Sequence, residues 1–151
     1  MSSNGPPQRL RRTPCMGICS TTYGDLVCRG CKRFAHEIIQ WNGFDQDQRE
    51  IVWNRLTELR DTCVRDVVHV GLRADLDAAC AARGLPMHEE NSTHSVAYEL
   101  LRRALNEPQV VVDAKIDLRE FETPIAALKA IDDLFLQRSR AHYERAFKTP
   151  L

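Results

Sequence analysis

The stretch from residue 14 to residue 41 reads PCMGICSTTYGDLVCRGCKRFAHEIIQW and contains four of the six cysteines of the chain. Three residues separate Cys15 from Cys19, and two residues separate Cys28 from Cys31. A pair at either spacing can bind one metal ion from a single turn, and a second pair completes a tetrahedral site. The sequence therefore predicts a four-cysteine metal site made of Cys15, Cys19, Cys28 and Cys31.

Two simpler explanations exist for these cysteines, namely two disulfide bonds or four unrelated free thiols. The N-terminal residues include arginines but no apolar segment of the kind that directs secretion, so a cytoplasmic location is expected. Disulfide bonds are rare in that reducing compartment, where clustered cysteines indicate metal binding. A closed set of four thiolates suits a structural Zn²⁺ ion, and an iron–sulfur cluster is the alternative cofactor.

Residues beside the cysteines can support such a site. Gly30 allows a tight turn between Cys28 and Cys31, where backbone amides can donate to the sulfur atoms. Four thiolates leave a net negative charge around the metal, and three neighbouring cations can offset it: Arg29, Lys32 and Arg33. His36 follows the last cysteine closely and is expected to face solvent or a hydrogen-bond acceptor near the ligands.

Outward from the cysteines, the spacing of apolar residues predicts helices. Phe34, Ile38 and Trp41 recur at helical spacing, and Asp45 with Gln48 forms the capping pattern that opens a second helix. The apolar face of that second helix consists of Val52, Leu56, Leu59 and Cys63. We therefore expect two short helices packed against the metal loop.

Helices are also predicted in the remainder of the chain. One is expected to end at Gly84, and another to begin at Ser92 or Thr93 and end before Pro108. Thr123-Pro124 is a strong helix start, with Thr as the cap and Pro in the first turn. A helix from there to residue 147 would be roughly 35 Å long.

Two segments have strand-like patterns. Residues 64–70 fit a helix or a strand equally well, and residues 109–118 alternate in the way that predicts a strand. The fold class is therefore predicted to be mainly α, with a small N-terminal four-cysteine metal knuckle packed on short helices. A helical C-terminal region with at most one or two short strands would follow. The expected divisions are a disordered segment 1–13, a metal-binding module 14–60 and a helical region 61–151.

Composition limits the functions to be considered. The chain has 151 residues, of which 43% are hydrophobic and 28% charged, and its net charge is zero. No run approaches the ~20 apolar residues of a membrane helix, so no membrane association is expected. No nucleophile elbow, phosphate-binding glycine loop or zinc-protease motif occurs, so catalysis has no positive support. The remaining cysteines, Cys63 and Cys80, lie on apolar helical faces and are expected in the core.

The cysteine pattern and the residues after it resemble an uncharacterised bacterial family, domain of unknown function 1289. The resemblance covers about residues 14–60. It depends on Pro14, Cys15, Gly17 and Cys19, on Cys28-Arg29-Gly30-Cys31, and on Arg33, Glu37-Ile38 and Trp41. Members are described as predicted iron–sulfur proteins, so the resemblance implies metal binding but no assigned activity. Lys32 and Phe34 depart from the pattern, since members commonly have Gly and a capping Thr there.

The function expected from these observations is a structural zinc module that presents a surface to a protein partner. In that role Arg29, Lys32 and Arg33 would remain available for contact. An iron–sulfur protein for electron transfer or sensing is the first alternative. A nucleic-acid-binding zinc module is the second, because residues 8–33 contain six cations and one acid.

Overall fold

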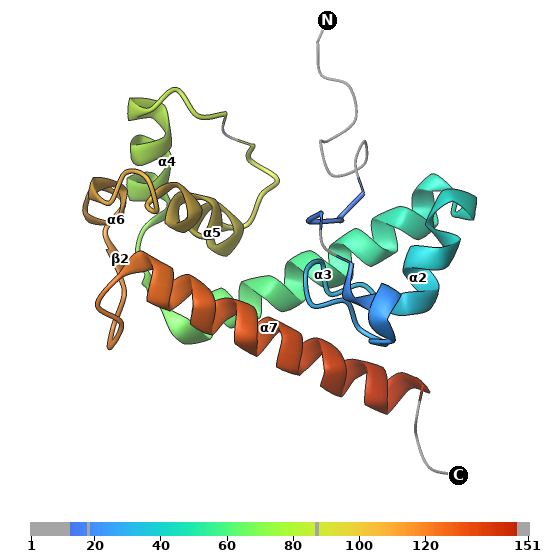
Figure 1. Ribbon diagram of the computed structural model, residues 1–151. Helices are drawn as coiled ribbons and strands as arrows, with labels where there is room; N and C mark the ends of the chain where they lie inside the picture. The colour runs from blue at the N-terminus through green and yellow to red at the C-terminus, as the bar shows by residue number, and fades with distance from the viewer. Residues whose placement is uncertain (1–12, 18, 87, 148–151) are drawn as a thin grey trace, which may run out of the picture. The chain divides into compact units, whose positions relative to one another are not determined.

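The structure is a computed structural model that describes residues 13–17, 19–86 and 88–147. The fold is mainly α, as the sequence predicts (Figure 1). The helices are η1 (Ser20–Tyr23), α2 (Ala35–Gln40), η2 (Trp41–Gly43), α3 (Gln46–Val67), α4 (Arg73–Ala82), α5 (Thr93–Arg103), α6 (Gln109–Asp113) and α7 (Pro124–Phe147). Two short strands, β1 (His69–Val70) and β2 (Ile116–Asp117), pair antiparallel with His69 opposite Asp117.

The chain divides into two compact units. The first runs up to Glu58 and also includes the chain from Leu136 onward, and the second is Leu59–Phe135. The helices α3 and α7 therefore each contribute to both units. The predicted disordered segment 1–13 lies outside the described residues, except for Thr13. None of the helices in the described ranges has the length and apolar character needed to cross a membrane.

The first unit is organised by a small hairpin that ends at the start of α2. Val27 pairs with Phe34 in an isolated antiparallel bridge, and the amide of Ala35 donates to the carbonyl of Leu26 at 2.9 Å. The helix α2 begins directly after this bridge, with Phe34 as its N-cap. Buried residues of this unit include Val27, Phe34, Trp41, Val52 and Leu56.

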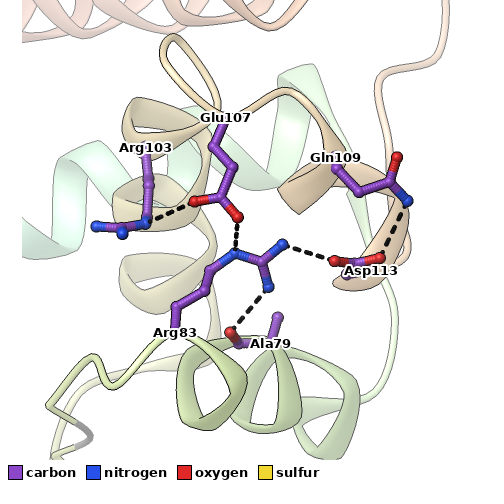
Figure 2. Close-up of polar contacts among 6 residues, drawn as sticks. All are labelled: Ala79, Arg83, Arg103, Glu107, Gln109 and Asp113. Atoms are coloured by element: carbon purple, nitrogen blue, oxygen red, sulfur yellow. Dashed lines mark hydrogen bonds and ion pairs between the residues drawn. The ribbon is translucent and has the colours of Figure 1, made fainter.

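The second unit has the larger apolar core. Its most deeply buried side chains include Cys63, Val64, Leu76, Leu100, Leu101, Val110 and Ile131. Cys80 is also buried in this core, which confirms the prediction for both outlying cysteines. Figure 2 shows the polar contacts of Arg83, the residue that follows α4: it donates to Glu107, which precedes α6, and to Asp113 in α6, each at 2.6 Å. It also donates to the carbonyl of Ala79 in α4 at 3.1 Å.

The predicted helix starts are confirmed at three positions. Asp45 and Gln48 exchange side-chain and backbone hydrogen bonds at 2.8 and 2.9 Å, which is the capping box expected before α3. Ser92 is the N-cap of α5 and accepts from the amide of Ser95 at 3.0 Å. Thr123 accepts from the amide of Ala126 at 3.2 Å, directly before Pro124 opens α7. Local capping chemistry therefore fixes these boundaries.

The prediction of a strand over residues 109–118 is wrong for its first half, which is the helix α6. Alternation would place Val110 and Val112 on one face, but Val112 is 65% exposed. The buried positions are instead Val110, Val111 and Ala114, which is helical spacing. Only Ile116–Asp117 is a strand. The ambiguous segment 64–70 contains both structures, since α3 ends at Val67 and β1 follows.

Candidate metal centre

The hairpin buries the second cysteine pair. The amide of Cys28 donates to the carbonyl of Arg33 at 3.0 Å, and the amide of Lys32 donates to the carbonyl of Cys28 at 2.9 Å. These bonds close the turn between the two cysteines. Cys28 and Cys31 are only 1% and 7% exposed as a result.

Backbone amides surround the sulfur of Cys28. Burial opposes ionisation of this thiol, but hydrogen bonds from the backbone N–H groups of Cys31, Ser20 and Gly30 outweigh it and lower the pKa of Cys28 to about 7. Amides that converge on sulfur stabilise a thiolate, the form that binds metal. The sequence predicted such donors between the cysteines, but not the donor from Ser20.

Cys31 has a different environment. Burial raises the pKa of the Cys31 thiol above its ordinary value, although the Nε of Arg33 donates to its sulfur at 3.3 Å. The guanidinium of Arg33 also lies over the ring of Trp41, 4.9 Å from the centroid. One cation is therefore placed directly beside a candidate ligand.

The first cysteine pair lies at the surface. Cys19 is half-buried, and a hydrogen bond with the Thr21 hydroxyl, 2.8 Å away, lowers the pKa of this thiol below its ordinary value. Cys15 is exposed, and its sulfur accepts from the amide of Gly17 at 3.3 Å. Ser20, the first residue of η1, connects the two pairs because its hydroxyl accepts from the amide of Arg29 at 2.8 Å.

The structure places the four predicted ligands in one unit, but it does not arrange them as a complete metal site. Cys28 and Cys31 are hydrogen-bonded to each other, and Cys19 is close enough to interact electrostatically with Cys28. Among residues 13–17, 19–86 and 88–147, no three or more His, Cys, Asp or Glu side chains are grouped as metal ligands. Four thiols as a donor set fit Zn²⁺ or an iron–sulfur cluster. The four-cysteine site remains a prediction.

The sequence predicted that the three neighbouring cations, Arg29, Lys32 and Arg33, would all remain available for contact, and the structure differs for two of them. Arg29 is exposed and pairs with Asp25 at 3.2 Å. Lys32 and Arg33, in contrast, are 1% and 3% exposed. The expectation is wrong for these two because the closed turn directs both side chains inward. His36 is exposed, as expected, with its ring 5.2 Å from that of Phe147.

One backbone conformation and two contacts that support the site were not found from the sequence. Lys32 adopts a left-handed φ of 65°, a conformation that lysine rarely takes and that its residue type does not indicate. Glu37 accepts from the amide of Phe34 at 2.8 Å, a bond that glutamate three residues into a helix could have indicated. The Phe34 ring contacts Tyr143 in α7, with 5.2 Å between centroids, and no local pattern links residues so distant in sequence.

Residues 13–60 match the sequence model of a family described as "Protein of unknown function (DUF1289)". This segment includes all four clustered cysteines and the helix α2. No curated protein and no solved structure matches the chain.

Proposed function

We propose that residues 13–60 are a metal-binding module in which Cys15, Cys19, Cys28 and Cys31 bind one structural Zn²⁺ ion. The observation that carries the proposal is the buried cation beside Cys31. Arg33 is 3% exposed, and no carboxylate in the described part of the chain lies within ion-pair distance of its guanidinium. Its partners there are the Cys31 sulfur and the Trp41 ring.

A buried guanidinium needs compensating negative charge. Taking such an ion out of water without a counter-charge is costly, so buried arginines are normally paired with carboxylates or phosphates. Four thiolates around Zn²⁺ carry a net charge of about −2 and would supply the missing counter-charge. The amides directed at Cys28 support the same interpretation, since they stabilise sulfur in its ionised form.

The donor set supports a structural metal rather than a catalytic one. Four protein ligands leave no open position on a tetrahedral ion, so the metal would stabilise the fold of its loop and would not bind substrate. An iron–sulfur cluster takes the same four thiolates and the same surrounding cations and amides. A cluster would make the protein an electron-transfer or sensor protein. Metal analysis distinguishes a cluster from zinc.

The module is further proposed to contact a protein partner. Two of the six cations that favoured nucleic acid, Lys32 and Arg33, are buried and cannot reach phosphate. Apolar side chains are exposed instead: Met16 is 58% exposed, Tyr23 is 88% exposed and Ile39 is 82% exposed. Methionine and aromatic residues are enriched at protein interfaces. These positions therefore favour a protein partner over nucleic acid.

The test is metal analysis and an absorption spectrum of protein purified without oxygen. We expect one zinc per chain and no visible absorption in the wild type, and loss of the metal in Cys28→Ser. Cys63→Ser is the matched control, because Cys63 is buried in the second unit and should leave metal content unchanged. Iron together with sulfide in the wild type would indicate an iron–sulfur cluster instead of zinc. Folded wild-type protein that contains no metal would refute the proposal of a metal-binding module.

A further inference from the structure

The ammonium group of Lys32 contacts the backbone of the turn that carries the cysteines. Its Nζ donates to the carbonyl of Arg29 at 2.6 Å and to the carbonyl of Gly30 at 3.1 Å. The side chain is 1% exposed, which is rare for lysine. The backbone of Lys32 is left-handed, with φ 65°, a conformation that costs an L-residue energy and persists only where its surroundings impose it.

The two carbonyls belong to the same peptide groups as two of the amides at the Cys28 sulfur. A trans peptide is planar, so the carbonyl of one residue and the N–H of the next point in opposite directions. The carbonyl of Arg29 is therefore opposed to the N–H of Gly30, and the carbonyl of Gly30 to the N–H of Cys31. Both of those N–H groups hydrogen-bond to Cys28.

We infer that Lys32 is a positioning residue that orients the amides of Gly30 and Cys31 toward the Cys28 sulfur. Its ammonium binds one side of the two peptide planes, and the sulfur binds the other side. The inference deepens the proposed function, on which its metal-binding consequence rests, because amides fixed toward a ligating thiolate would strengthen its hold on the metal.

Lys32→Met is the direct test, since methionine preserves an unbranched side chain of similar reach but cannot donate to the carbonyls. Arg29→Met is the matched control. It removes one positive charge from the same turn, but the Arg29 side chain is 65% exposed and binds Asp25 instead of the turn backbone. An effect of charge alone would be shared by the two variants, although weaker for the exposed and screened Arg29. An effect of amide orientation would occur only in Lys32→Met.

The first readout needs no metal. In the reduced, metal-free protein, Lys32→Met should move the amide proton resonances of Gly30 and Cys31 upfield and accelerate their hydrogen exchange. The amide of Ser20 is an internal control, because it also donates to Cys28 but belongs to neither of the two peptide groups whose carbonyls, of Arg29 and Gly30, accept from Lys32. Unchanged resonances for Gly30 and Cys31, or an equal change at Ser20, would overturn the inference.

The second readout is affinity for Zn²⁺ by competition with a chelator. Removing a residue that orients a ligand typically weakens metal binding about 10-fold to 100-fold, and we expect a loss in this range for Lys32→Met. Arg29→Met should change the affinity much less. If the wild type binds no zinc, the proposed function fails while the amide readout still decides the role of Lys32. Equal affinity losses in the two variants would overturn the positioning role.

Lys32→Gly covers the case in which Lys32→Met does not fold. Glycine adopts positive φ without strain, so this variant keeps the turn accessible while removing the ammonium. We expect the same two amides to move and Ser20 to remain unchanged. If Lys32→Gly retained the wild-type resonances of Gly30 and Cys31, the backbone alone would orient them, and the inference would be wrong.

Discussion

The guanidinium of Arg55 in α3 donates to both carboxylate oxygens of Glu37 in α2, at 2.5 and 2.7 Å. The same carboxylate accepts from the amide of Phe34 at the start of α2, and the Arg55 guanidinium lies 4.1 Å from the centroid of the Phe34 ring. One ion pair therefore joins the end of the cysteine hairpin, the N-terminus of α2 and the middle of α3.

Arg55→Ala should destabilise the first unit by about 3 kcal/mol, because removing one partner of a largely buried ion pair leaves the other charge uncompensated. The Glu37 and Arg55 side chains are 8% and 20% exposed. Tryptophan fluorescence during denaturant unfolding measures this directly, since Trp41 and Trp53 both lie in the first unit. The control is Arg29→Ala, because its pair with Asp25 lies in the same unit, is largely exposed and should contribute less than about 1 kcal/mol. Equal destabilisation by Arg55→Ala and by the control variant would contradict a specific stabilising role for the ion pair between Arg55 and Glu37.

Tyr143→Ala should destabilise the same unit, although Tyr143 lies far outside the matched family segment. Its ring meets that of Phe34 at an interplanar angle of 67°, and an aromatic pair of this kind contributes about 0.5–1.5 kcal/mol beyond the area it buries. Tryptophan fluorescence again reports the change. Tyr23→Ala makes the same substitution at a side chain that is 88% exposed and should stay within about 0.5 kcal/mol of the wild type. A wild-type stability in Tyr143→Ala would show that the contact between Phe34 and Tyr143 does not stabilise this unit.

The sequence predicted those parts of the fold that depend on neighbouring residues. The caps at Asp45 and Thr123 are decided within one helical turn, so their residue types sufficed. The prediction for the segment from Gln109 failed because the alternation of Val110, Val112 and Ala114 indicated a strand, whereas the segment begins as the helix α6. Burial of Val110 and Val111 in the second core decides between them, and that contact is tertiary.

The same distinction applies to the candidate site. The spacing of Cys28 and Cys31 indicates a shared turn, and the structure has that turn. The inward direction of Lys32 and Arg33 could not be predicted, because lysine and arginine are usually exposed and the sequence does not show which way a turn directs them. The packing of Phe34 on α7 has no local signal, since the two segments meet only in the folded chain.

The second unit should show a pH dependence through Asp113. The Arg83 side chain, followed by that of Gln109, lowers the pKa of the Asp113 carboxyl below its ordinary value. A carboxyl with a lowered pKa in the folded state contributes stability above its unfolded pKa of about 3.9, and this contribution is lost as pH falls through the folded value. The stability difference between wild type and Asp113→Asn should therefore be largest near neutral pH and narrow below about pH 4.

Circular dichroism during urea unfolding at several pH values measures this difference. Asp133→Asn serves as the control, because Asp133 is 65% exposed and binds only Lys129 four residues away in the described chain. Its stability difference from the wild type should be small, as is usual for an exposed pair of this spacing. An Asp113→Asn difference that stayed constant from pH 7 to pH 3 would argue against the role of the Arg83 contact.

Arg33→Met should have opposite effects on the metal-free and metal-bound protein if the four cysteines bind Zn²⁺. Without metal, the variant replaces a buried cation that has no carboxylate in the described chain by an apolar side chain, so stability should be unchanged or higher. With metal, it removes a favourable interaction with a site of net negative charge, so zinc affinity should fall about 10-fold to 100-fold. Denaturant unfolding with and without one equivalent of zinc measures both effects. Arg29→Met, which removes an exposed cation, should change neither state strongly. Equal destabilisation of both states by Arg33→Met would show that Arg33 acts through its packing on Trp41 and not as a counter-charge.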